Sequence, residues 1–559
     1  MRTSALLCAW PACALLLACG DDLPPAEDPT DELFRRDRLL EIEVELAPAD
    51  WDLLRVQHAD LFGQLVDDCP GPLPDDPYTV FPAAITIDGE RFEDVSVRKK
   101  GFLGSINRTR PSLKISFDEI DPDREVFGLE RLTLNNNQQD VSHLDTCLAY
   151  QVFADAGIAA PRCNWAHVTV NGEDLGVYSN VESVRRRFLA RHFEDSSGNL
   201  YEGQVADLRP SWVERYEDKN GNDGDRSDLD AVVEALEADD DELIDALEAV
   251  VDVDQFLTFW ATEVLVGHWD GYNGNRNNHY LYRDPSTGRF HFLPWGPDSA
   301  FGDPNPFLAQ QPPPSVWANN ILASRLYATD AGRARYRERL RELLDTVWDE
   351  QRLLDEIDRA SELVAPHVHV PDAAFEDAVE KVRDFVTDQR DRLEEDLAAD
   401  PDWTVPLPDS HCAAIKGSAS GTFSAPFADF PPENVFAGSG TLAMTLDGAD
   451  LEFESVFAGA GPNNDPSHPR FTMGPFGVLD GGDILIPAML VEPEVWTEQT
   501  LAVDGYDVFG ILVRTNIATP DALVVVGFLR GEVTIDAAPT TDGETVSGSF
   551  DLEIIQPLD

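Results

Sequence analysis

Residues 268–275 (HWDGYNGN) place an aspartate, Asp270, five positions ahead of an asparagine, Asn275. A second aspartate, Asp298, stands shortly downstream, separated by one serine from Ala-Phe-Gly. Phosphoryl transfer uses side chains of these types, because a carboxylate orients the attacking hydroxyl while carboxylate and amide oxygens bind a divalent cation beside the phosphates. Magnesium and manganese prefer such hard oxygen ligands. The spacing therefore predicts a phosphotransfer site built from these three residues.

A predicted hairpin explains how Asp298 could reach the other two residues. Residues 279–295 (HYLYRDPSTGRFHFLPW) alternate as two strands around a Pro-Ser-Thr-Gly turn. Such a hairpin returns the chain to its starting point, so Asp298 is expected beside Asp270. An Asn- and Gly-rich loop can also be a plain surface loop, and the spacing alone is therefore a weak signal.

The elements expected around this site mix strands and helices as far as residue 400. Alternation predicts strands or hairpins at 39–48, 81–101, 111–120 and 165–182. Helical periodicity marks 142–157, 228–266 and 331–400. From about Cys412 short alternating runs replace it, which is typical of a β-sandwich. The predicted organisation is an α+β, two-lobed domain at 38–400, a proline-marked linker at 401–411 and an all-β, sandwich-like domain at 412–559.

The charge of the chain limits its partners. The 559 residues include 42 Lys and Arg against 104 Asp and Glu, a formal net charge of −62. Such a surface repels the phosphates of nucleic acids and anionic lipids, so no nucleic-acid partner is expected. Most of these carboxylates are expected simply to form a solvated acidic surface.

The N-terminus predicts export. Residues 1–18 combine Arg2 with an apolar run too short to span a membrane, and they end in Leu-Leu-Ala ahead of Cys19. This ending resembles the bacterial lipobox, which implies that Cys19 carries a lipid and that membrane contact is through this lipid. A plain secretory signal is the alternative. Residues 19–37, acidic and proline-containing, are predicted to be a tether. The expected location is the cell envelope.

Four cysteines remain for the folded protein: Cys69, Cys147, Cys163 and Cys412. In an oxidising compartment they allow three disulfide pairings, between which the sequence does not decide. We favour Cys147–Cys163, because the first would lie on a helix and the second on the strand that folds back beside it.

Several motifs in one order resemble the CotH kinase family: VRKKGFLGS, RPSLKISF, VTVNGEDLGVYSNVE and NNHYLYRDPSTGRFHFLPWGPDSAFG. The resemblance covers about residues 40–400. It implies a divergent protein-kinase-like fold that uses ATP with Mg²⁺ or Mn²⁺ to phosphorylate serine or threonine on exported proteins.

The resemblance also implies roles for single residues. Asp270 would act as the catalytic base, and Asn275 and Asp298 would bind the metal. Arg98 and Lys114 would contact the ATP phosphates, unless they are simply exposed strand residues. Glu182 would pair with Lys114 or lie by the nucleotide.

Two departures from the family pattern leave a second function open. Gly296 stands where a further carboxylate is expected, and Asn277 or Asn278 would have to compensate. Residues 185–187 are three arginines where the family often has an aspartate. The main hypothesis is an exported, lipid-anchored Ser/Thr protein kinase. The alternative is a catalytically weak or inactive kinase-like surface module that binds a protein or a glycan.

Overall fold

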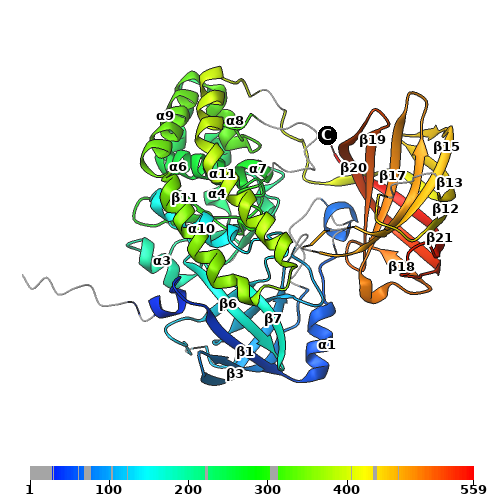
Figure 1. Ribbon diagram of the computed structural model, residues 1–559. Coiled ribbons are helices and arrows are strands. Elements are labelled where there is room, and N and C mark those ends of the chain that lie inside the picture. The colour runs from blue at the N-terminus through cyan, green and yellow to red at the C-terminus, as the bar shows by residue number, and fades with distance from the viewer. Residues whose placement is uncertain are drawn as a thin grey trace, which may run out of the picture.

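In the computed structural model, the first lobe is a closed β-barrel (Figure 1). The strands run in the order β1-β2-β3-β4-β5-β7-β6, and parallel pairing of β1 with β6 closes the ring. On β1 buried and exposed residues alternate, so apolar side chains fill the barrel interior. The barrel strands are β1 (Leu40–Leu46), β2 (Phe81–Ile87), β3 (Glu90–Lys100), β4 (Ser112–Ser116), β5 (Arg131–Asn135), β6 (Cys163–Val170) and β7 (Glu173–Val181).

The structure describes most of the chain, and the statements below refer to that part. It comprises residues 28, 30–60, 62–67, 69, 77–101, 105–122, 124–220, 224–302, 313–403, 406–431, 437–463, 465–466 and 468–558.

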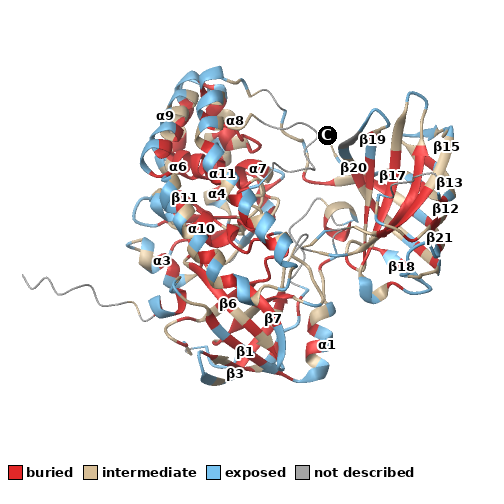
Figure 2. Ribbon diagram, in the orientation of Figure 1, coloured by how far each residue is buried: buried red, intermediate tan, exposed pale blue. Residues whose placement is uncertain are grey.

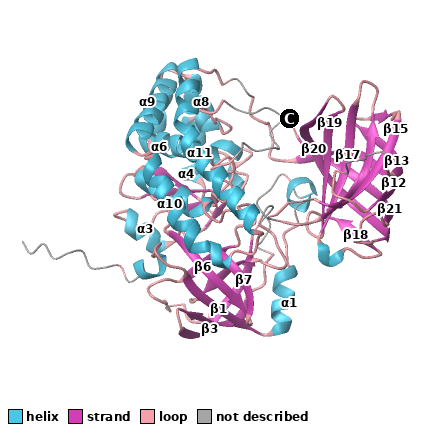
Figure 3. Ribbon diagram, viewed as in Figure 1, coloured by secondary structure: helices cyan, strands magenta, loops and turns pink. Residues whose placement is uncertain are grey.

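The second lobe joins a small sheet to a group of helices, which lie above the barrel in the view of Figure 3. The sheet has the order β11-β10-β8-β9, and its strands are β8 (Leu200–Gly203), β9 (Tyr216–Asp218), β10 (His279–Asp284) and β11 (Arg289–Pro294). The α-helices of the two lobes are α1 (Pro48–Val56), α2 (Asp145–Asp155), α3 (Arg186–His192), α4 (Ser227–Ala235), α5 (Leu243–Glu248), α6 (Val253–Val266), α7 (Tyr272–Asn275), α8 (Ile321–Ala328), α9 (Asp330–Thr346), α10 (Glu350–Val364) and α11 (Asp372–Ala399).

Helix α6 is the central element of the second lobe. Almost all of its side chains are buried, and it packs against α9 and β11. Asp252 caps its start by accepting the N–H of Gln255 over 3.0 Å, and Gly267 ends it in the left-handed conformation, with φ +67°. The loop with the predicted chemistry begins directly after this rigid helix.

The C-terminal domain is one antiparallel sheet of ten strands rather than two stacked sheets. The sheet curls so that its two ends touch, with β13 against β15, and the buried residues fill the inside of the curl (Figure 2). Its strands are β12 (Ala413–Pro426), β13 (Ser439–Leu446), β14 (Ala449–Leu451), β15 (Ser455–Pro462), β16 (Phe471–Val478), β17 (Asp483–Val491), β18 (Gln499–Val503), β19 (Val508–Asn516), β20 (Thr519–Ala537) and β21 (Thr545–Pro557).

The predicted fold class, α+β followed by all-β, is confirmed. The predicted linker falls between the end of α11 and the start of β12. Two disulfides are present, and Cys147–Cys163 joins α2 to β6 as predicted, whereas Cys69–Cys412 links the first lobe to the start of the C-terminal domain.

The N-terminal segment needs one correction. The 3₁₀ helix at Asp31–Phe34 lies within the predicted tether, yet Leu33 and Phe34 are buried in the barrel core. The folded lobe therefore begins before residue 37, because these two apolar side chains pack inside it. Residues 1–18 and Cys19 lie outside the described part. Within the described residues, no helix has both the length and the apolar composition needed to cross a bilayer.

Candidate active site

A buried carboxylate holds the loop that carries Asp270. Glu263 on α6 has no exposed surface and accepts the backbone N–H of Tyr272 over 3.0 Å and of Asn273 over 2.9 Å. Burial raises the pKa of Glu263 to about 8. Gly271 is required beside it, because a Cβ there would lie 2.2 Å from Oε1 of Glu263. The loop conformation thus depends on contacts made by the helix before it.

Three asparagine amides surround the carboxylate of Asp270. Nδ2 of Asn275 donates to Oδ1 over 2.8 Å, and Nδ2 of Asn278 and of Asn277 donate to Oδ2 over 2.7 and 3.2 Å. Burial raises the pKa of Asp270 to about 7, helped by the negative charge of Asp298 and opposed by the asparagine hydrogen bonds. A carboxylate with this pKa can accept a proton near neutral pH, as a general base must.

The β10–β11 hairpin brings Asp298 back to this loop, as predicted. At the open end of the hairpin, the N–H of Trp295 donates to the carbonyl oxygen of Asn278 over 3.2 Å. Asp298 is 7% exposed, and its Oδ2 accepts a hydrogen bond from Nδ2 of Asn135 on β5 over 3.0 Å. Burial raises the pKa of Asp298, while Asn135 and the positive charge of Lys100 lower it. Residues from both lobes therefore meet at this carboxylate.

This donor set suits a small divalent cation. Asp270 and Asp298 offer carboxylate oxygens, and the Oδ1 of Asn275 is not used in its bond to Asp270. Burial raises the pKa of both carboxylates, so a bound cation would stabilise their ionised forms. Hard oxygen donors of this kind fit Mg²⁺ or Mn²⁺.

Gly296 stands where the resemblance leads to the expectation of a further carboxylate. Its backbone is left-handed, with φ +51°, and its N–H donates to the hydroxyl of Tyr150 over 3.1 Å. A Cβ here would lie 3.0 Å from Oδ1 of Asn278. The oxygen of Asn277 instead accepts the N–H of Val205 over 3.3 Å. Of the two residues expected to compensate, only Asn278 places its amide oxygen against Gly296.

The predicted phosphate-contacting residues lie side by side on the barrel. Arg98 on β3 and Lys114 on β4 are directly opposite in the antiparallel register, and Lys100 is two residues further along β3. Burial lowers the pKa of Lys114 to about 7, and the positive charges of Arg98 and Arg185 add to this effect. Within the described ranges, the side-chain amines of Lys100 and Lys114 form no hydrogen bond or ion pair, although both backbones pair within the sheet. The face of β3 and β4 thus gathers three basic side chains in a strongly acidic chain.

Glu182 makes different contacts from those expected. Its side chain is 1% exposed and forms ion pairs with Arg162, at 2.8 Å, and with Arg191. Arg162 also forms an ion pair with Asp31 in the N-terminal segment, at 2.6 Å. No ion pair joins Glu182 to Lys114 in the part of the chain that is described, so the expectation of that pair is wrong. The two guanidinium groups neutralise this buried carboxylate, and Arg162 also attaches the N-terminal segment to the barrel.

The sequence reasoning missed the segment between β5 and α2. Asp140 in that segment and Asp145, the first residue of α2, are buried. Burial, followed by nearby carboxylate charge that includes Asp298, raises the pKa of both, to about 6 for Asp140. Oδ1 of Asp145 has no hydrogen-bond partner among the described residues. The run of five side-chain amides at 135–139, which begins at the last residue of β5, was the available signal.

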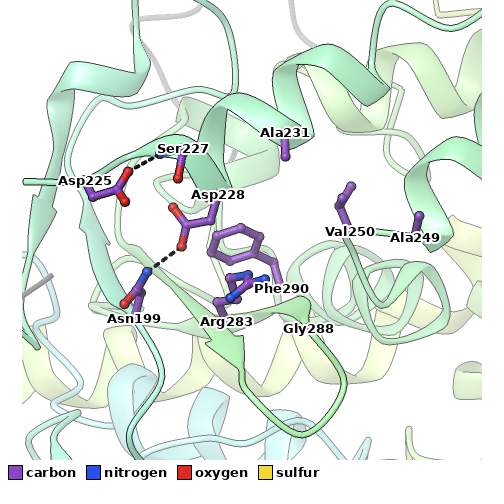
Figure 4. Close-up of a pocket in the computed structure, with 10 residues that line it drawn as sticks. All are labelled: Asn199, Asp225, Ser227, Asp228, Ala231, Ala249, Val250, Arg283, Gly288 and Phe290. Atoms are coloured by element: carbon purple, nitrogen blue, oxygen red, sulfur yellow. Dashed lines mark hydrogen bonds between the residues drawn. The ribbon is translucent and has the colours of Figure 1, made fainter.

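A separate pocket of about 450 Å³ opens beside the turn of the β10–β11 hairpin (Figure 4). The loop that carries Asp270 lies at the other end of this hairpin. Nδ2 of Asn199 donates to Oδ2 of Asp228 over 2.6 Å at its wall. None of the predicted site residues lines this pocket; its lining residues are Asn199, Asp225, Ser227, Asp228, Ala231, Ala249, Val250, Arg283, Gly288 and Phe290.

Comparison with known proteins gives a family match over residues 97–393, described as CotH kinase protein. Inner spore coat protein H of Bacillus subtilis is 28% identical over 41% of this chain and 63% of its own length. Invasin CotH2 of Rhizopus delemar is 23% identical over 38% of each chain. The chain thus spans less than two thirds of the length of these two relatives.

Two solved structures are also similar. The proinflammatory kinase CtkA of Helicobacter pylori has a TM-score of 0.28 and 10% identity, covering 54% of this chain and 92% of that one. HipA, in a Shewanella oneidensis complex with HipB and operator DNA, has a TM-score of 0.31 and 14% identity, covering 65% and 74%. At these scores, the architecture described above rests on the strands and helices of this chain alone.

Proposed function

Because the chain belongs to the CotH kinase protein family, we propose that it is an exported protein kinase that transfers the γ-phosphate of ATP to serine or threonine hydroxyls of envelope or secreted proteins. One observation carries this proposal: the β10–β11 hairpin returns the chain to the loop of Asp270 and brings Asp298 near it, so that the charge of Asp298 raises the pKa of Asp270. Lys100, at the end of β3, is in turn close enough to lower the pKa of Asp298.

In this proposal each residue has a defined task. Asp270 accepts the proton of the attacking hydroxyl, whose oxygen bonds to the γ-phosphorus as the bond to the β–γ bridging oxygen breaks. Arg98, Lys100 and Lys114 orient the triphosphate and offset its negative charge. Asp298 and Asn275 would hold Mg²⁺ or Mn²⁺, which supplies further charge neutralisation when bound.

The proposed location follows from the N-terminal sequence. A lipid on Cys19 would anchor the protein in the cell envelope, and the charge of −62 disfavours nucleic acid as a partner. The substrate would therefore be a protein that passes through or resides in the envelope.

Autophosphorylation tests the enzymatic proposal. Purified protein starting at Gly20, incubated with radiolabelled ATP and Mn²⁺, should incorporate phosphate. The variant Asp270→Ala should lose this labelling, whereas Asp241→Asn, at an exposed site before α5, should keep it. Equal labelling of Asp270→Ala and the parent protein would reject the role of Asp270.

Gly296 favours the second candidate, a kinase-like surface module without turnover that binds a protein or a glycan, because one expected carboxylate is absent. A thermal shift separates the two. A nucleotide-binding enzyme gains stability from MgATP by mass action, whereas a module without a nucleotide site does not.

A further inference from the structure

Outside the candidate active site, three histidines and two carboxylates gather where the end of α10 approaches the barrel strands β6 and β7 (Figure 1). This histidine cluster consists of Glu41 on β1, His167 on β6, Asp174 on β7, and His367 and His369 in the connection between α10 and α11. It therefore joins the barrel to the helical lobe.

His167 is held as a metal-binding histidine is held. Its Nδ1 contacts Oε2 of Glu41 at 2.9 Å, and its Nε2 points at Oδ1 of Asp174, 3.0 Å away. Metal-bound histidines usually donate one ring N–H to a carboxylate, which fixes the tautomer and leaves the other nitrogen for the metal. Glu41 is placed for the first task and leaves Nε2 for the second.

Asp174 is the centre of the cluster. Its Oδ1 accepts the backbone N–H of Gly176 over 2.8 Å and also lies 3.5 Å from Nε2 of His369. Gly176 has φ +76°, and a Cβ there would lie 2.9 Å from the carbonyl oxygen of His367 and 3.2 Å from the ring of His369. A glycine at this position allows the α10–α11 connection to approach the carboxylate.

We propose that His167, Asp174 and His369 bind a divalent transition-metal ion of the Zn²⁺ class, which links the barrel to the helical lobe. Imidazole nitrogen with one carboxylate oxygen is a donor set that such ions select, whereas Mg²⁺ prefers oxygen alone. The ring of His367 is a further imidazole in the cluster, centred 4.5 Å from that of His167.

Two of the three ligand separations in the cluster match those that such a site requires. Tetrahedral zinc with bonds of about 2.0–2.1 Å places its ligand atoms about 3.4 Å apart, and the two nitrogen–oxygen separations here are 3.0 and 3.5 Å. Binding must still bring His167 and His369 nearer to each other. Among the described residues, the ligand atoms of His167, Asp174 and His369 do not all lie within 4.8 Å of one another. Those of Cys69, His411 and Cys412 do, but the two sulfurs of that group form a disulfide. The side chain of His369 is 38% exposed, so the approach to His167 would come from this side chain.

A protonated His167 between two carboxylates is the competing explanation, and calorimetry distinguishes them. Zn²⁺ is titrated into the protein starting at Gly20, without reductant and with saturating Mg²⁺ to occupy the oxygen donors near Asp298. We expect one zinc site per chain. His369→Ala and Asp174→Asn should each weaken zinc binding at least tenfold, and Glu41→Gln should weaken it about tenfold.

Two controls make the result specific. Glu173→Gln, one residue from Asp174 on the same exposed strand end, and Asp298→Asn, in the candidate active site, should bind zinc as the parent does. Co²⁺ at the same site should give the intense visible absorption of tetrahedral cobalt, which His369→Ala should lose. Absence of a one-site isotherm, or equal zinc affinity in His369→Ala, Asp174→Asn and the parent, would overturn the proposal. Because His369 and Asp174 are surface residues, both variants are expected to fold.

Discussion

The amide of Asn278 donates to Oδ2 of Asp270 over 2.7 Å, while its oxygen lies against Gly296, 3.0 Å from where a Cβ would be. One side chain thus connects the proposed base to the position at which a carboxylate was expected. Its nitrogen influences the protonation of Asp270, and its oxygen occupies the space of the absent side chain. A substitution at Asn278 should therefore change the pKa of Asp270, whereas a substitution at Gly296 should change the stability of the protein.

Replacing Asn278 with alanine should move the acid limb of the pH profile of kcat/KM to higher pH. The lost hydrogen bond stabilises the ionised carboxylate, so its removal raises the pKa of Asp270 above about 7. A bond to a charged group contributes about 1.5–3 kcal/mol, which corresponds to a shift of about one pH unit or more. Asn516→Ala removes an Asn-to-Asp bond, 2.7 Å to Asp483, from the C-terminal domain and should leave the limb in place. If the acid limb of the kcat/KM profile stayed in place in Asn278→Ala, a group other than Asp270 would be responsible for it.

Gly296→Asp should destabilise the protein rather than simply restore a ligand. A side chain at φ +51° is strained, and this one would also press on Asn278, so we expect a loss of about 1–2 kcal/mol in the free energy of unfolding by urea. Gly543 has φ +78° with nothing within 4 Å, and Gly543→Asp therefore measures the backbone effect without the contact.

A double variant then isolates the contact. Asn278→Ala combined with Gly296→Asp should be less destabilised than the sum of the single changes, by about 0.5 kcal/mol or more. Additive losses, or equal losses at Gly296 and Gly543, would show that Asn278 does not restrict residue 296.

Local patterns in the sequence were enough to predict part of this site. The period-two alternation at 279–295 predicted the hairpin, and the hairpin brought Asp298 to the loop of Asp270. Alternation likewise predicted β3 and β4, whose antiparallel pairing puts Arg98 opposite Lys114. The Cys147–Cys163 disulfide followed from a helix and a strand that are neighbours in the chain.

Other features depend on contacts between distant segments, which local patterns do not report. Glu182 pairs with Arg162, directly before β6, and with Arg191 on α3. The sequence positions of these arginines do not show that they, and not Lys114, are its partners. Leu33 and Phe34 are two apolar residues in an acidic stretch, and only the barrel core explains their burial. Asn135 reaches Asp298 across 163 residues.

Lys114 should lower the free energy of unfolding of the protein, although it contributes to the binding of MgATP. An unfolded lysine has a pKa near 10.5, whereas that of Lys114 is about 7. Between these values the unfolded chain binds more protons at this position than the folded chain, so its contribution makes stability rise with pH across that window. Lys114→Met should raise the free energy of unfolding by about 2 kcal/mol at pH 7, after allowance for solvent screening, and by less as pH approaches 10.5.

Urea unfolding at pH 7 and 9.5 measures this effect, and MgATP thermal shifts measure the cost to binding. Lys381→Met, on the exposed face of α11, should change stability by less than about 0.5 kcal/mol. It should keep the thermal shift with MgATP, which Lys114→Met should lose. If Lys114→Met were less stable than the parent at pH 7, burial of this lysine would not reduce the free energy of unfolding.

Removing the Cys147–Cys163 disulfide should destabilise the first two lobes. It closes a loop of 16 residues between α2 and β6, and loop-closure entropy for a ring of this size predicts a loss of about 3 kcal/mol in the double variant Cys147→Ala, Cys163→Ala. Urea unfolding followed by tryptophan fluorescence would measure the loss, because Trp165 and Trp260 are buried in the same core. The parent protein treated with reductant should lose at least as much stability, since Cys69–Cys412 opens as well. If the double variant unfolded at the parent's urea concentration, the constraint would lie in the packing of α2 on β6 and not in the covalent bond.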